Sequence, residues 1–173
     1  MLSSGYTSDC AVEQIRIEPK GEHPMNQQQI EIVQRTFDMA APMADEIAGS
    51  FYQRLFELDP ALRPMFHGDM TQQGQKLMTV LALAVRGLSK PETIIQAVQR
   101  LGQRHAGYGV QAQHYATVGE ALLSTLAEVF GPAFTEEVRA AWTAAYTLLA
   151  TIMQEAAVAE GDARRPIREA SAV

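Results

Sequence analysis

The feature that most constrains this chain is the spacing of its apolar residues, which recur every three or four positions from about residue 25 to residue 158. This period matches one face of an α-helix, and no stretch shows the alternation and β-branched enrichment of a strand. A chain of 173 residues with 47% hydrophobic residues can bury one core but is short for two. The sequence therefore predicts one all-α domain over residues 25–158.

Proline, glycine and capping residues divide this region into helices. Pro42 separates the first two, Asp59 and Asp69 are expected caps, and Gly131 with Pro132 ends a long helix. The predicted helices span residues 27–41, 43–58, 60–65, 69–88, 89–105 and 111–130, and a last one starts at Thr135. Residues 1–24 and 159–173 lack the pattern, so we expect a flexible N-terminal extension and a C-terminal tail.

Charge and cysteine content exclude several classes of protein. A net charge of −6 disfavours a nucleic-acid or anionic-membrane partner, because both favour clustered Lys and Arg. Cys10 is the single cysteine, so neither an intrachain disulfide nor a cysteine zinc site can form. No apolar run is long enough to span a bilayer, and the N-terminus lacks the pattern of an export signal. The expected location is the cytoplasm.

Four histidines carry the remaining metal-binding chemistry. The sequence contains no Gly-x-Ser-x-Gly, phosphate-binding loop or His-Glu-x-x-His motif. His23 belongs to the extension, His114 has a polar neighbour, and His67 lies in a predicted loop. His105 ends an amphipathic helix just before Gly107 and Gly109, where its imidazole could project between helices. Taken alone, His105 is more often an ordinary surface or half-buried histidine than a ligand. Haem iron, however, needs one neutral imidazole in an apolar slot beside an aromatic side chain, and this chain offers each part.

At this point the order of the helices and a set of residues resemble the globin family, in particular single-domain bacterial haemoglobins and the haem domain of flavohaemoglobins. The residues that carry the resemblance are Phe51-Tyr52, Phe66, Gln73, Leu77, His105 and Tyr115, together with the stretches Lys76-Leu77-Met78, Arg104-His105, Tyr108-Gly109-Val110 and Ala141-Trp142-Thr143. The resemblance covers about residues 25–157. It implies a globin fold, a helical sandwich around a haem pocket.

The resemblance also implies a role for each matching residue. His105 matches the proximal iron ligand, and Phe66 matches the corner phenylalanine that packs on the porphyrin. Tyr52 matches the tyrosine that faces the bound gas; the less favoured alternative is that its ring fills the core while its hydroxyl reaches solvent. Gln73 and Leu77 match the distal polar residue and its apolar neighbour.

Counting forward from Phe66 would put Lys76 at the distal position, whereas counting back from His105 selects Gln73. We favour Gln73 because it belongs to the apolar stripe of its helix, and Lys76 then becomes a partner for a haem propionate. Tyr108 and Tyr115 are implied neighbours of the haem on the proximal side, Tyr115 as support for the imidazole. The glutamate that completes this support in flavohaemoglobins falls on Ala157, which weakens the case for a strongly activated haem.

The function implied is a haem b globin that reversibly binds dioxygen, nitric oxide or carbon monoxide at ferrous iron, as in oxygen transport. Nitric oxide dioxygenation, which detoxifies nitric oxide, is the most plausible reaction, with Tyr52 and Gln73 acting on the gas. No flavin or nicotinamide domain follows residue 158, so a separate reductase would supply electrons. The alternative is a gas or redox sensor that signals through a partner. A haem-free globin-fold interaction protein is a third class, which Tyr52, Gln73 and His105 together argue against.

Overall fold

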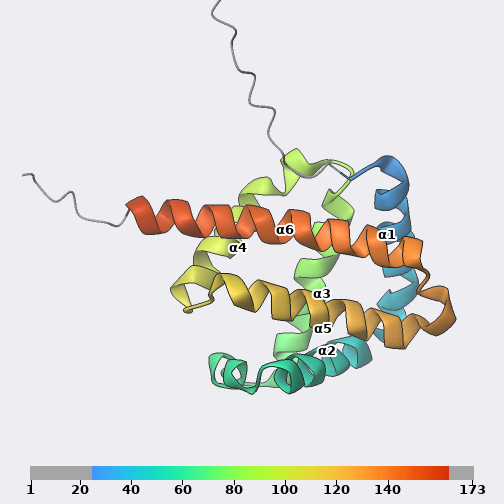
Figure 1. Cartoon of the computed structure of the whole chain (residues 1–173), viewed down its shortest axis with the longest axis horizontal. Coiled ribbons are helices and arrows are strands. Elements are labelled where there is room, and N and C mark those ends of the chain that lie inside the picture. The colour runs from blue at the N-terminus through green and yellow to red at the C-terminus, as the bar shows by residue number, and fades with distance from the viewer. Residues whose placement is uncertain (1–24, 164–173) are drawn as a thin grey trace, which may run out of the picture.

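The computed structural model describes residues 25–163, in which helices form and no strand occurs (Figure 1). The all-α prediction is confirmed for this range. The α-helices are α1 (Gln27–Ala40), α2 (Ala44–Leu58), α3 (Met70–Gly87), α4 (Ile95–Gly107), α5 (Ala112–Phe130) and α6 (Glu136–Ala163). Short 3-10 turns lie at η1 (Ala41–Met43), η2 (Pro60–Met65), η3 (Pro91–Thr93) and η4 (Gly131–Ala133). The expected extension over residues 1–24 and the last ten residues of the expected tail lie outside the described range.

The helices pack in crossed layers. In Figure 1, α5 and α6 run side by side at the front and α3 crosses behind them at a steep angle. Helix α4 packs along α6, which also contacts α1, while α2 packs against α3 and α5. The core between these layers includes Trp142, which is 2% exposed and donates its indole N–H to the Thr36 hydroxyl at 2.9 Å. This bond satisfies a polar group that burial would otherwise penalise.

The predicted helix starts are confirmed by their caps. The Asp59 carboxylate accepts a hydrogen bond from the Ala61 N–H at 3.0 Å, and Asp69 accepts from Thr71 and Gln72 at the start of α3. The Thr135 hydroxyl accepts from the Val138 N–H at 3.4 Å. Short polar side chains at these positions satisfy backbone donors that no helix carbonyl can reach.

Two predicted boundaries are wrong. The sequence predicts a tail from residue 159, but α6 continues to Ala163 because the Ala-rich run before Gly161 favours a helix and one glycine does not end it. The helix predicted over residues 89–105 instead splits into η3 and α4. Pro91 starts the short 3-10 turn, and the Ile94 side chain covers Gly87 at the end of α3.

The crossing of α2 and α3 is unusually close. A Cβ added at Gly74 would lie 2.9 Å from the Cβ of Ala48, so the two helices approach through their smallest side chains. This contact fixes where the first turns of α3 sit relative to α2.

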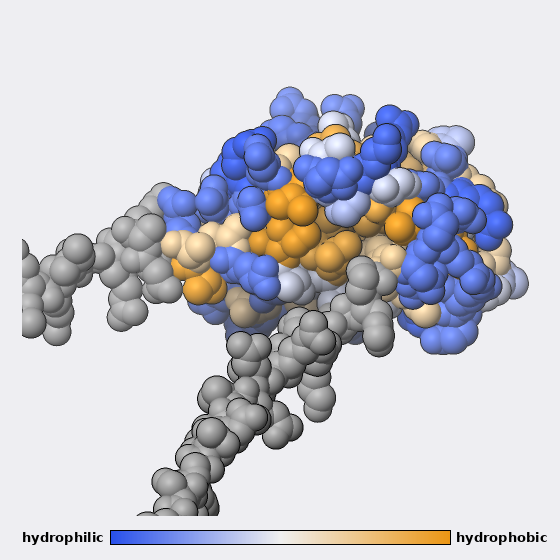
Figure 2. Space-filling model, turned by 90° about the horizontal axis from the view of Figure 1, so that it is seen from above, coloured by the Kyte–Doolittle hydropathy of each residue, from blue (hydrophilic) through white to orange (hydrophobic). Residues whose placement is uncertain are grey.

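The surface of the molecule is largely polar, with a local exception. Seen from above, it shows an apolar area at the centre of a face that is otherwise mostly polar (Figure 2). Among the described residues no helix is long and apolar enough to span a membrane.

Candidate functional site

An aromatic cluster at the end of α2 and the end of η2 surrounds Tyr52. The Tyr52 ring lies 5.1 Å from the Phe51 ring and 5.3 Å from the Phe66 ring, both in edge-on geometry, and stacks on Phe56 at 6.0 Å. Only 8% of Tyr52 is exposed. Edge-on aromatic pairs hold a ring in one orientation, so the direction of the Tyr52 hydroxyl is set by its neighbours.

The Tyr52 hydroxyl reaches the first turns of α3. It donates to the main-chain carbonyl of Gln73 at 3.4 Å, and burial raises the pKa of this hydroxyl above its ordinary value. The group is therefore a protonated hydrogen-bond donor at neutral pH. The α2–α3 contact thus brings together Tyr52 and Gln73, two residues that the sequence analysis singled out.

The side chain of Gln73 makes a different contact from the one with Tyr52. Its amide donates to the carbonyl of His67 at 3.2 Å, across the connection between η2 and α3. Gln73 and Leu77 are half-buried, and Leu77 packs against the core, whereas Lys76 is exposed and joins no ion pair in the described chain. Gln73 and Leu77 lie one turn apart on the inner side of α3, and Lys76 lies beside them.

His105 lies in the last turn of α4 and is half-buried. Its Nδ1 atom is 2.9 Å from the main-chain carbonyl of Leu101, one turn earlier. Because a carbonyl can only accept, we assign the ring proton to Nδ1, which leaves an unprotonated lone pair on Nε2. Burial lowers the pKa of the imidazole, the bond to Leu101 raises it, and Arg104 lowers it further, with a net decrease. A neutral imidazole with a free Nε2 is the form that binds metals.

Three tyrosines lie at the ends of α4 and α5 and on α6. Tyr108 caps α4, is 68% exposed, and has its ring 6.4 Å from that of His105. Tyr115, in the first turns of α5, is half-buried, and its main-chain carbonyl accepts a hydrogen bond from the Tyr146 hydroxyl. The contact of the imidazole Nδ1 atom is with the Leu101 carbonyl, which the sequence did not single out, and the support expected from the Tyr115 side chain stays a prediction. The four-residue helical spacing between Leu101 and His105 was the available signal.

The other two histidines of residues 25–163 make contacts within the chain, whereas His23 lies outside the described residues. His114 accepts the Gln111 N–H at its Nδ1 atom, 3.1 Å away, in a capping box at the start of α5. His67 is exposed and offers its carbonyl to Gln73. Across residues 25–163 no three His, Cys, Asp or Glu side chains gather as a metal site. Of the histidines in this range, His105 is the one that is half-buried at the end of a helix with its Nδ1 atom bonded to a main-chain carbonyl.

Helices α3 and α4 are held apart by their different partners. Helix α4 rests on α6, where Gly102 touches the main chain of Met153, and α3 rests on α2 and α1. Gln73 and Leu77 therefore lie on a helix that packs against α1 and α2, whereas His105 lies on a helix that packs against α6.

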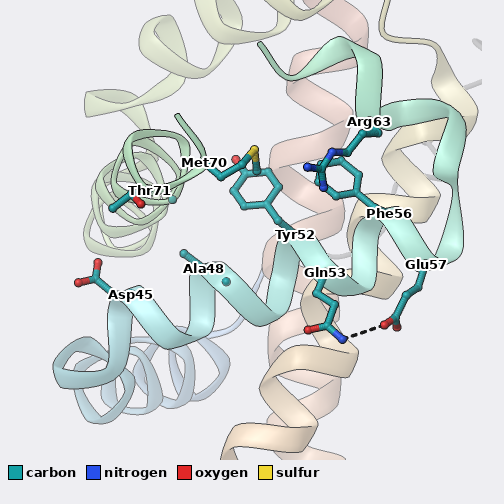
Figure 3. A pocket seen from close by; sticks show the side chains of 11 residues that line it. Asp45, Ala48, Tyr52, Gln53, Phe56, Glu57, Arg63, Met70 and Thr71 are labelled. Carbon is teal, nitrogen blue, oxygen red and sulfur yellow. Dashed lines mark hydrogen bonds between the residues drawn. The ribbon is translucent and has the colours of Figure 1, made fainter. Parts of the chain in front are cut away.

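A groove of about 590 Å³ runs along α2 and is lined in part by Tyr52 (Figure 3). Its walls come from α2, η2 and α3, and its lining includes Tyr52, Phe56 and Met70 but not His105.

The sequence of the chain matches a known protein family. The sequence model named Globin matches residues 49–153, more than half of the chain. The chain belongs to the globin family. Flavohemoproteins of Bordetella pertussis and Vibrio cholerae are 34% and 32% identical to this globin over 125 and 131 residues, which cover 70% and 74% of it. These segments are 31% and 33% of the relatives, so the globin matches about a third of their length.

Solved structures show the same fold. An engineered carbene transferase, derived from an assigned nitric oxide dioxygenase of Rhodothermus marinus, superposes with a TM-score of 0.70 and 29% identity, covering 80% of this globin and 95% of that chain. A bacterial globin from Campylobacter jejuni superposes with a TM-score of 0.71 at 23% identity, over 79% and 99% of the two chains. The predicted globin fold, similar to the haem domain of flavohaemoglobins, is thereby confirmed.

Proposed function

We propose that this globin holds a haem and reversibly binds diatomic gases at ferrous iron, with His105 as the protein ligand to the metal. The observation that carries the proposal is the hydrogen bond from His105 Nδ1 to the Leu101 carbonyl, which leaves Nε2 free. When bound, a ferrous haem supplies an iron atom with an open position for dioxygen, nitric oxide or carbon monoxide. His105 fits a haem, because a half-buried neutral imidazole is the ordinary protein ligand to the iron in globins.

Other side chains would hold the macrocycle. Phe66 and Leu77 offer half-buried apolar side chains that pack against the core, and we assign them to the haem face. Lys76 is exposed, so its ammonium group is available to a propionate. We assign Tyr108 and Tyr115 to the proximal side, near the end of α4. We propose haem b, the common iron protoporphyrin, as the bound group.

Tyr52 and Gln73 would act on the gas. The Tyr52 hydroxyl is a protonated donor on a ring that three aromatic neighbours orient, so it can stabilise a ligand that carries partial negative charge. The Gln73 amide donates to His67, and a rotation of this side chain would bring a second donor toward the gas.

Nitric oxide dioxygenation is the reaction that the relatives favour. One solved relative carries the name of a nitric oxide dioxygenase, and the curated relatives are flavohemoproteins. In this reaction nitric oxide and dioxygen combine to nitrate, and one electron is needed per turnover to return the iron to its ferrous state. We propose a separate reductase in the cytoplasm as the electron donor.

Two measurements test these proposals in order. Purified protein mixed with haem is expected to show a Soret band at one haem per chain, with shifts on reduction and on adding carbon monoxide; no band would contradict haem binding. Nitrate is then measured per nitric oxide consumed, with a chemical reductant supplied. Repeated turnover supports a dioxygenase, and a single stoichiometric burst contradicts one and leaves a gas carrier.

A further inference from the structure

The groove on α2 has an apolar floor and a polar rim. Its floor is formed by Ala48, Tyr52, Phe56 and Met70, and Figure 3 shows Tyr52 and Met70 side by side on it. Neutral diatomic gases are small and weakly hydrated, so an apolar floor does not repel them. A groove of about 590 Å³ gives them far more room than they need.

Two of the three charged residues that line the groove, Glu57 and Arg63, are engaged with their neighbours, and the third is Asp45. Glu57 accepts from Gln53 at 2.9 Å and pairs with Arg54 at 3.4 Å, while the Arg63 guanidinium lies 4.9 Å from the centre of the Phe56 ring. These contacts tie Glu57 and Arg63 to the chain. They do not create a site for a charged ligand, and they leave the floor accessible to a neutral one.

Small residues keep the groove open next to the helix crossing. A Cβ at Gly49 would meet no atom within 4 Å, so this position faces open space. Gly49 lies beside Ala48, which touches Gly74 on α3. Any larger side chain at Gly49 would project from α2 beside the groove floor.

The groove ends at the Tyr52 ring, whose hydroxyl faces α3. Tyr52 lines the groove with its ring, and its hydroxyl extends to the Gln73 carbonyl. The Tyr52 side chain therefore extends from the groove to the first turns of α3. The hydrogen bond from Gln73 to His67 bridges the connection between η2 and α3.

We infer that the groove along α2 is the access route by which neutral diatomic gases reach the inner side of α3, with the Tyr52 ring at its inner end. This inference rests on the proposed function, because it requires a gas-binding haem between α3 and α4. It assigns Gly49 and Thr71, on opposite walls of the groove, to control of the rate at which gases pass.

Carbon monoxide rebinding after flash photolysis tests the route in haem-loaded protein. Gly49→Leu fills the groove from α2, and Thr71→Leu narrows it independently from α3. Each is expected to slow association, Gly49→Leu by about tenfold, which corresponds to about 1.4 kcal/mol of added barrier. Carbon monoxide release should slow by the same factor, because a narrowed route changes both rates and leaves the equilibrium affinity unaltered.

Matched variants separate the route from other effects. Gly161→Leu adds the same side chain at an exposed α6 position that also faces open space, and Gly49→Ala adds only a methyl group; both should rebind carbon monoxide at the wild-type rate. Wild-type association rates in both Gly49→Leu and Thr71→Leu would overturn the route, and so would a change in affinity with unchanged association. A wild-type protein without a Soret band would overturn the proposed function and the route together.

Discussion

The His105 imidazole and the Leu101 carbonyl belong to the same helix, one turn apart, and their contact selects the ring nitrogen that remains free. The sequence narrowed four histidines to His105 by its place before a glycine-rich bend. The protonation of its ring could not be predicted, because it depends on the geometry of the last turn of α4. Likewise, the pairing of the Tyr52 hydroxyl with a main-chain carbonyl depends on how closely α2 and α3 approach.

Tyr52→Phe tests the distal donor. Losing the hydroxyl removes a hydrogen bond to a partly charged acceptor, which contributes on the order of 1.5 kcal/mol, so dioxygen should leave about tenfold faster. Stopped-flow displacement of dioxygen measures this rate. Tyr146→Phe is the control, because that hydroxyl bonds to the Tyr115 carbonyl and should leave dioxygen release unchanged. Equal release rates in Tyr52→Phe and wild type would contradict the assignment of Tyr52.

Tyr146 also predicts how stability depends on alkaline pH. Burial, with a smaller effect from Tyr115, raises its pKa above the ordinary value of 10.0. Above that pH the unfolded chain loses the phenolic proton while the folded chain keeps it, so the free energy of unfolding falls as pH rises. Urea midpoints measured from pH 9 to pH 11 should therefore decline less in Tyr146→Phe than in wild type. Parallel declines would show that another group titrates.

At the scale of elements, helix starts were more predictable than helix contacts. Asp59, Asp69 and Thr135 cap helices where the sequence predicted them, because capping is a local interaction. The α2–α3 crossing at Ala48 and Gly74 could not be predicted, since neither residue signals its partner 26 positions away. The end of α6 was missed because residues 159–163 lack the apolar spacing of the domain, although the alanine-rich run before Gly161 favours a helix.

The crossing predicts a compensating pair of substitutions. Gly74→Ala should lower the free energy of unfolding, because the new methyl group would lie 2.9 Å from the Ala48 Cβ. Ala48→Gly combined with Gly74→Ala exchanges the two side chains and should recover much of that loss, giving a coupling on the order of 1 kcal/mol. Urea unfolding of the four chains measures the coupling. Additive effects would mean that the two residues do not share a contact.

At the scale of the whole molecule, α3 and α4 pack against different helices. Helix α3 contacts α1 and α2, and α4 contacts α6. The all-α fold followed from helical spacing alone, because periodicity reports which face of each helix is buried. The separation of α3 from α4 could not be predicted from helical spacing, because it depends on packing between segments distant in sequence, such as Gly102 against Met153. A bound haem would link these two units, so haem binding is expected to stabilise the whole fold.

The most direct test of His105 as the iron ligand is the absorption spectrum of the ferrous protein, recorded for wild type and for His105→Gly with and without added imidazole. We predict that wild type shows a five-coordinate histidine-bound haem, that His105→Gly loses this spectrum, and that free imidazole restores it by occupying the space of the missing ring. An unchanged ferrous spectrum in His105→Gly without imidazole would contradict the assignment.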